Sequence, residues 1–240
     1  MLSLPHPEAL VAEFLLRWFH YLGGITWIGL LYYFNFVQGP FMAEADPAAK
    51  STATQKLLPR ALVWFRGGAI VTFLTGLAIL GKRLGESPLG AGAWSTPWAI
   101  TILTGALFGT LMFFNVVLVI WPKQQIVIAS AKAAASGGQA NAAAPVAARR
   151  AFLASRTNVV FSIPMLFFMG AASHFTLPAG GSLAAYWASV LVVAALLEIN
   201  CLTATTGTTT KPIEKITGVI VTGFVVWAIV YGLARAFLSA

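Results

Sequence analysis

Histidines are the side chains of this protein best able to bind a metal or a haem iron. The 240 residues contain three of them, His6, His20 and His174, and a single cysteine, Cys201. One cysteine excludes an intramolecular disulfide, a Cys-x-x-Cys redox pair and a Cys-x-x-Cys-His haem attachment site. Neutral imidazole remains, and it is an ordinary axial ligand of haem iron.

Small residues lie on the same helical face as two of these histidines. Gly23 and Gly24 follow His20 by one turn, and Gly170 precedes His174 by one turn. Residues three and four apart share a helix face, so each imidazole would stand beside a surface that a flat macrocycle can cover. The spacing predicts a haem b site with His20 and His174 as iron ligands. Close helix packing is the alternative explanation of the same glycines.

The other residues near this site have simpler expected roles. Trp27 lies one turn beyond the two glycines and is a candidate wall of the haem site. His6 precedes the first apolar segment, and we interpret it as a solvated terminal residue. An iron with two histidine ligands has no open position for oxygen or substrate, so the predicted role is electron relay. The sequence identifies no catalytic residue.

The composition places these histidines in a membrane. Hydrophobic residues make up 58% of the chain and charged residues 9%, and the mean hydropathy is +0.82. An ordinary globular domain carries about 25% charged residues. A water-soluble enzyme, a disordered chain and a nucleic-acid-binding protein are therefore excluded, and we expect no nucleic-acid partner.

Six segments are long and apolar enough to cross a bilayer. We expect an all-α, polytopic membrane helix bundle of about six transmembrane helices, formed by residues 1–240 as a single domain. The approximate limits of the spans are 14–37, 61–81, 97–121, 157–177, 183–203 and 216–238. Residues 123–156 are predicted to form a long cytoplasmic linker that is mobile or weakly helical. Residues 41–60 resemble a short interfacial helix.

Basic residues gather in alternate connections between these spans. The first, third and fifth connections hold Lys50, Lys56, Arg60, Arg66, Lys123, Lys132, Arg149, Arg150, Arg156, Lys211 and Lys215, and the other side holds Arg17, Lys82, Arg83 and Arg235. The positive-inside rule then predicts that both termini lie outside the cytoplasm. In that orientation His20 and His174 both lie toward the outer face.

A second polar group is expected in the cytoplasmic half of the bundle. Its members are Asn35, Arg66, Asn115, Glu198 and Asn200. Charges inside a membrane are costly unless they are paired, so we predict a buried ion pair between Glu198 and Arg66. A proton or quinone site is the alternative. The pattern Gly105-x-x-x-Gly109 in the third span is typical of close helix packing.

Several short motifs resemble the membrane region of the bacterial membrane-bound urate oxidases (urate hydroxylases). They are Arg17-Trp18-Phe19-His20, Trp27-Ile28-Gly29, Leu58-Pro59-Arg60, Trp64-Phe65-Arg66, Asn115-Val116-Val117, Ile120-Trp121-Pro122, Ser155-Arg156-Thr157-Asn158, Ile163-Pro164 and Ser173-His174-Phe175. Their order and approximate spacing match over roughly residues 14–177.

The resemblance implies a bacterial inner membrane protein with redox function and electrons passed to a c-type haem. With the predicted orientation, both termini would then lie in the periplasm. The resemblance also implies that His20 and His174 occupy the family's histidine positions. The family's C-terminal cytochrome c domain has no counterpart in these 240 residues. Gly68 stands where the family tends to carry an acidic residue.

Two functions fit these observations. The first is a membrane-bound oxidoreductase subunit of the cytochrome b type, which works in electron transport and exchanges electrons with a periplasmic c-type cytochrome or a quinone. The second is a non-catalytic accessory subunit that packs, among membrane lipids, in a larger respiratory or photosynthetic complex. Transport has less support, because the six spans show neither inverted halves nor interrupted helices.

Overall fold

The protein is all-α, as the sequence predicts. A computed structural model describes residues 7–239, and no strand occurs among them. The elements in chain order are α1 (Pro7–Tyr32), η1 (Tyr33–Gln38), α2 (Gly39–Glu44), α3 (Pro47–Thr52), η2 (Ala53–Leu57), α4 (Leu58–Gly85), η3 (Gly90–Ser95), α5 (Pro97–Phe114), η4 (Asn115–Ile120), α6 (Trp121–Ala135), α7 (Ala144–His174), α8 (Leu183–Thr203), α9 (Lys211–Glu214) and α10 (Ile216–Leu238). His6 lies outside the described residues.

Five helices of the described chain are long and apolar enough to cross a membrane. They cover Pro47–Gly85, Pro97–Ala135, Ala144–His174, Leu183–Thr203 and Ile216–Leu238, and each overlaps one of the last five predicted spans, the one predicted over 157–177 ending three residues early. The first predicted span falls in α1 and η1. That segment is helical, but it is not among the five, since Arg17, His20 and Asn35 lower its hydropathy.

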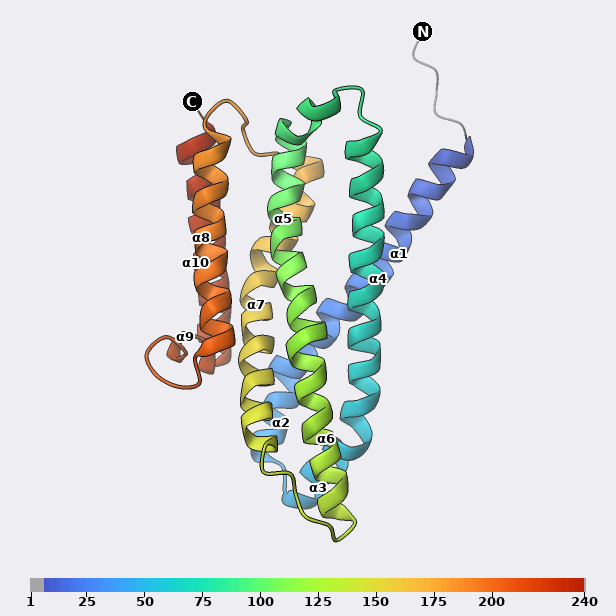
Figure 1. Cartoon of the computed structure of the whole chain (residues 1–240), viewed down its shortest axis with the longest axis vertical. Coiled ribbons are helices and arrows are strands. Elements are labelled where there is room, and N and C mark those ends of the chain that lie inside the picture. Colours follow the sequence, from blue (N-terminus) through green and yellow to red (C-terminus); the bar gives the residue numbers. More distant parts are fainter. Residues whose placement is uncertain (1–6, 240) are drawn as a thin grey trace.

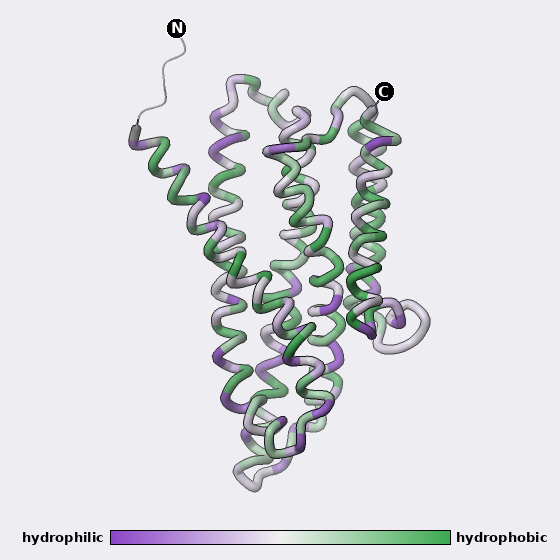
Figure 2. Tube along the Cα trace, turned by 180° about the vertical axis from the view of Figure 1, so that it is seen from behind, coloured by the Kyte–Doolittle hydropathy of each residue, from purple (hydrophilic) through white to green (hydrophobic). Residues whose placement is uncertain are grey.

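The helices form an elongated bundle around α7 (Figure 1). In the most apolar window of α7, 67% of the residues are buried, against 22% to 33% in the other four spans. α8 and α10 stand together on one side of the bundle, and α1 crosses behind it and leaves it toward the N-terminus (Figures 1 and 2). The described parts of both termini lie at the same end of the bundle, which we call the upper end.

Close packing of α5 against α7 confirms the structural interpretation of the Gly105 motif. A Cβ atom added to Gly105 would lie 3.1 Å from the carbonyl oxygen of Met165 and from the backbone nitrogen of Met169. The absent side chain lets the two backbones approach, which is how small residues act in membrane helix pairs. α5 thereby brings Phe108 and Met112, both fully buried, into the core around α7.

The prediction of a long, weakly structured linker over residues 123–156 is wrong. α6 continues from α5 through η4 to Ala135, and α7 begins at Ala144, so the connection has only eight residues. Alanine has the highest intrinsic helix propensity, and the Ala-rich sequence extends the helices instead of separating them. The backbone N–H of Asn141 donates to Ser130 Oγ at 2.9 Å, which ties the short connection to α6.

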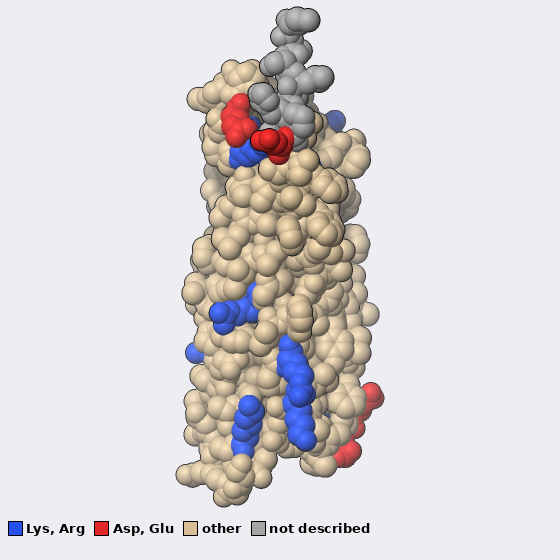
Figure 3. Space-filling view, turned by 90° about the vertical axis from the view of Figure 1, so that its right-hand side faces the viewer, with Lys and Arg blue, Asp and Glu red and all other residues tan. Residues whose placement is uncertain are grey.

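The lower end of the bundle extends beyond α8 and α10. At 1.5 Å per residue, the 39 residues of Pro97–Ala135 are about 58 Å long and the 21 residues of α8 about 32 Å long. Only the shorter length matches a bilayer. Figure 3 shows an uncharged band between a charged cluster at the upper end and basic side chains in the lower half, as expected where lipid surrounds the protein.

Candidate functional site

A groove lies beside His174 at the upper end of the bundle. Its volume is about 590 Å³, and it is lined by Leu166, Phe167, Gly170, Ala171, His174, Phe175, Trp227 and Tyr231. A Cβ atom added to Gly170 would meet no atom within 4 Å, so this glycine forms an open part of the floor. His174 and Gly170 therefore share one apolar surface, as their spacing predicts.

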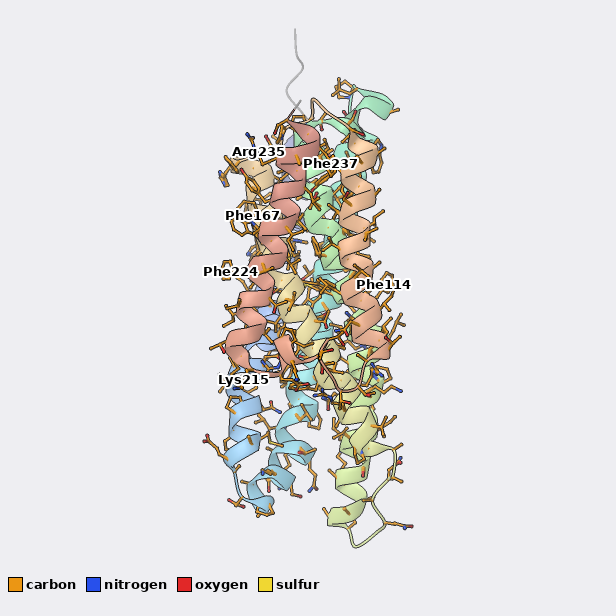
Figure 4. The ribbon with its side chains drawn as sticks, turned by 90° about the vertical axis from the view of Figure 1, so that its left-hand side faces the viewer. Phe114, Phe167, Lys215, Phe224, Arg235 and Phe237 are labelled. Atoms are coloured by element: carbon orange, nitrogen blue, oxygen red, sulfur yellow. The ribbon has the colours of Figure 1, made fainter. Side chains whose placement is uncertain are left out.

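Aromatic rings of α7 and α10 form one wall of this groove. Trp227 and Tyr231 are stacked with their ring centroids 6.0 Å apart, and Phe167 meets Trp227 edge to face at 5.2 Å (Figure 4 shows Phe167 beside α10). The indole N–H of Trp227 is buried and has no acceptor within residues 7–239. Since this N–H has no exposed area, a ligand in the groove would meet mainly aromatic and aliphatic surface.

His20 lies in a different contact, between α1 and α4. Its Nδ1 is 3.2 Å from Thr75 Oγ1, and Thr75 Oγ1 in turn donates to the carbonyl of Val71 at 2.6 Å. Because the hydroxyl proton of Thr75 is donated to the Val71 carbonyl, we assign Nδ1–H of His20 as the donor to Thr75 Oγ1. Nε2 of His20 then keeps its lone pair, the arrangement usual for a histidine that ligates a metal.

The two histidines do not share a described cavity. The groove around His174 is lined by α7 and α10, and His20 is absent from its lining. Each imidazole alone suits an axial ligand, whereas the joint site remains a prediction. No group of three or more His, Cys, Asp or Glu residues that could hold a metal ion occurs within residues 7–239.

The glycines next to His20 serve helix packing in this structure. A Cβ atom on Gly23 would lie 2.7 Å from Thr72 Oγ1 and 3.1 Å from the carbonyl oxygen of Gly68, so α4 already fills that space. Gly24 is freer, with Thr72 Cγ2 at 4.0 Å. Trp27 is buried in the core, and a Cβ atom on Gly68 would lie 3.0 Å from its backbone nitrogen.

The second polar group surrounds α7 in the lower half of the predicted membrane region. Asn115 Nδ2 donates to Asn158 Oδ1 at 3.0 Å and to Glu198 Oε2 at 3.1 Å, which joins η4, α7 and α8. Asn35 Nδ2 donates to Ser155 Oγ at 2.7 Å, which joins η1 to α7. Buried polar groups in membrane helices face the bundle interior and need such partners.

The predicted ion pair between Glu198 and Arg66 is wrong. Glu198 accepts its hydrogen bond from Asn115, and the guanidinium of Arg66 stacks on Trp121 with its carbon 4.4 Å from the ring centroid. A cation above an indole face is stabilised by the ring quadrupole without any carboxylate. Asn200, the other predicted member, donates to the carbonyl of Thr209 at 3.2 Å, outside the network.

Two π-helical segments carry the asparagines of this network. Asn35 lies in η1 and Asn115 opens η4, and both side chains are buried. Side-chain amides supply donors to carbonyls beside these segments: Asn35 Nδ2 donates to the Leu31 carbonyl at 2.8 Å, and Asn158 Nδ2 to the Met112 carbonyl at 3.0 Å. π-Helical turns are rare and are frequently found at functional sites.

Sequence reasoning missed three groups that shape these sites. Thr75 orients His20. Trp227 and Tyr231 form one side of the groove of His174, and Asn158 connects Asn115 to the backbone of α5. A signal existed only for Asn158, as a buried polar residue in an apolar span. The others depend on how neighbouring helices are rotated about their axes.

Comparison with known families identifies the chain at the level of its membrane domain. The family model described as urate oxidase N-terminal matches residues 91–231, which is more than half of the chain. The chain therefore belongs to this family, and the resemblance seen in its motifs is confirmed. The match runs from η3 into α10 and includes His174, and it leaves His20 outside its limits. No curated protein and no solved structure matches the chain.

Proposed function

We propose that this member of the urate oxidase N-terminal family is a redox subunit of the bacterial inner membrane. It binds haem b near the periplasmic end of the bundle and exchanges electrons with a periplasmic c-type cytochrome or a quinone. The groove that contains His174 carries this proposal, because it combines an imidazole, a bare glycine floor and stacked aromatic rings.

The residues of the groove suit a flat, largely apolar ligand. Gly170 leaves room for a ring system against α7, and the stacked Trp227 and Tyr231 offer aromatic surface beside it. His174 supplies an axial imidazole, and His20 is the candidate for the second, with Thr75 fixing its tautomer. When bound, the haem supplies one-electron transfer. The protein would set the orientation of the bound group.

Spectra of histidine variants test the proposal. We expect the purified protein to show b-type bands in the reduced-minus-oxidised spectrum, and His174→Ala to abolish them. If His20 also binds the iron, His20→Ala should shift the bands. Thr75→Val frees the His20 ring and gives a smaller shift, whereas Thr75→Ser keeps the hydroxyl and the wild-type spectrum.

Two results would decide against a haem. If the folded protein binds no added haem and stays colourless, the accessory-subunit function is supported instead. Unchanged bands in His174→Ala would remove the groove from the site. Circular dichroism of every variant confirms that the helices are retained.

A further inference from the structure

A small basic pocket opens at the start of α7, on the side of the bundle that carries α8 and α9. Its volume is about 270 Å³, and it is lined by Pro145, Val146, Arg149, Arg150 and Thr205. Two adjacent arginines and one threonine thus line a single cavity, mostly with their carbon atoms. Guanidinium groups are donors that proteins use for phosphate groups.

The positive charge around this pocket exceeds the negative charge. Arg149 forms a two-pronged ion pair with Glu214. Arg150 donates from Nη1 to the carbonyls of Cys201 at 2.7 Å and Ala204 at 2.9 Å, which carry no formal charge. Its own charge therefore has no carboxylate partner in the described chain, and one further anion would balance it.

Arg156, two turns further along α7, adds to this excess. Its guanidinium carbon lies 5.0 Å from the Phe152 ring centroid, and that of Arg149 lies 5.3 Å from the same centroid. Arg156 is 6% exposed, and its Nε and Nη1 have no hydrogen-bond partner within residues 7–239. Three arginines on this flank thus share one nearby carboxylate, that of Glu214.

The pocket lies at the expected level of the lipid headgroups. The carbonyls bonded by Arg149 and Arg150 belong to the end of α8 and to the connection after it, and α10 starts at Ile216 on the same side. Above this level α10 exposes Ile220, Val221 and Phe224, and Figure 4 shows Phe224 above Lys215 at the lower end of this helix. Acyl chains can cover this apolar surface.

We propose that the pocket of Arg149, Arg150 and Thr205 binds the phosphate of an anionic phospholipid. A free phosphate would use the same donors, but it would leave the exposed apolar surface of α10 without a role. The lipid phosphate supplies the anion that Arg150 lacks, and its acyl chains lie against α10. Basic pockets between transmembrane helices on the cytoplasmic side bind anionic headgroups in this way.

Native mass spectrometry of the detergent-purified full chain, titrated with phosphatidylglycerol, tests this site. We expect one bound lipid per chain, with phosphatidylcholine binding at least about fivefold more weakly. Arg150→Gln weakens phosphatidylglycerol binding about fivefold, the factor for one surface charge at about 1 kcal/mol. Arg150→Lys retains the charge and stays near wild type. Glu214→Gln removes the competing carboxylate and tightens binding about fivefold.

Arg235→Gln is the matched control, since it removes one positive charge from the far end of α10. Equal loss in Arg235→Gln and Arg150→Gln would overturn the site in favour of a general charge effect. Weaker binding in Glu214→Gln would also overturn it, because Glu214 would then be part of the lipid contact. Displacement of the lipid by inorganic phosphate at equal concentration would assign the pocket to free phosphate. None of these outcomes depends on haem.

Discussion

At the scale of single residues, the side-chain amide of Asn115 is the centre of the buried polar network. It donates at once to Asn158 and to Glu198, and Asn158 passes the contact on to the Met112 carbonyl. The carboxyl group of Glu198 uses only one oxygen in this network. A carboxamide at position 198 offers the same acceptor.

Substitutions at the two ends of this contact should therefore differ in effect. We expect Asn115→Ala to lower the free energy of unfolding by about 1–3 kcal/mol, because Asn158 loses a buried partner. Glu198→Gln should leave it unchanged within about 0.5 kcal/mol. Thermal unfolding in detergent measures both. Equal losses in the two variants would show that Glu198 pairs with a cation after all.

At the scale of elements, the contact between α1 and α4 depends on one glycine more than on its neighbour. Gly23 lies against backbone and against a hydroxyl that is itself fixed, since Thr72 Oγ1 donates to the Gly68 carbonyl at 2.7 Å. Gly24, the next residue, faces much more open space.

Alanine at these two positions separates packing from helix propensity. Gly23→Ala should cost about 1–3 kcal/mol of unfolding free energy, because the added methyl group overpacks the crossing. Gly24→Ala should be neutral or stabilising by up to about 1 kcal/mol, because alanine favours the helix. Urea or thermal unfolding of both variants in one detergent checks this. A tolerated Gly23→Ala would mean that α1 shifts readily against α4.

At the scale of the whole molecule, the distribution of charge predicts the orientation in the membrane. The basic lower end carries the short connection between α6 and α7, and the upper end carries η3 and the described parts of both termini. Ser136 and Ala91 lie in these two regions and both are exposed.

Cysteine accessibility in spheroplasts tests this orientation. Ser136→Cys should react with a membrane-impermeant maleimide only after lysis, and Ala91→Cys should react before it. The native Cys201 is 1% exposed and gives little background. Labelling of Ser136→Cys in intact spheroplasts would place the lower end outside the cell.

The sequence predicts the position of a residue along a helix better than the direction in which its side chain points around the helix axis. Hydropathy located five spans, and the spacing of small residues placed Gly170 beside His174 and packed Gly105 against α7. The pair of Glu198 and Arg66 failed because similar depth does not bring two side chains to the same flank. Arg66 stacks on Trp121, and Glu198 accepts a hydrogen bond from Asn115.

The linker prediction failed for a related reason. Low complexity between residues 129 and 148 suggested mobility, yet alanine needs only a neighbouring surface to stay helical. α7 provides it, and Ile128 and Ser130 of α6 are buried there. Tertiary packing, which composition does not show, decided the structure of this segment.

The π-helical turn η4 sets the rotation of α6 about the helix axis relative to α5. A π-turn holds one residue more than an α-turn. Each residue of an α-helix advances the chain by about 100° around its axis, so conversion of η4 to α-helix would swivel α6 by that angle against α5. The face of α6 that buries Ile128 and Ser130 would turn away from α7, while the upper half of α5 stayed still. The hydrogen bonds from Asn115 to Asn158 and Glu198 hold η4 against this rotation.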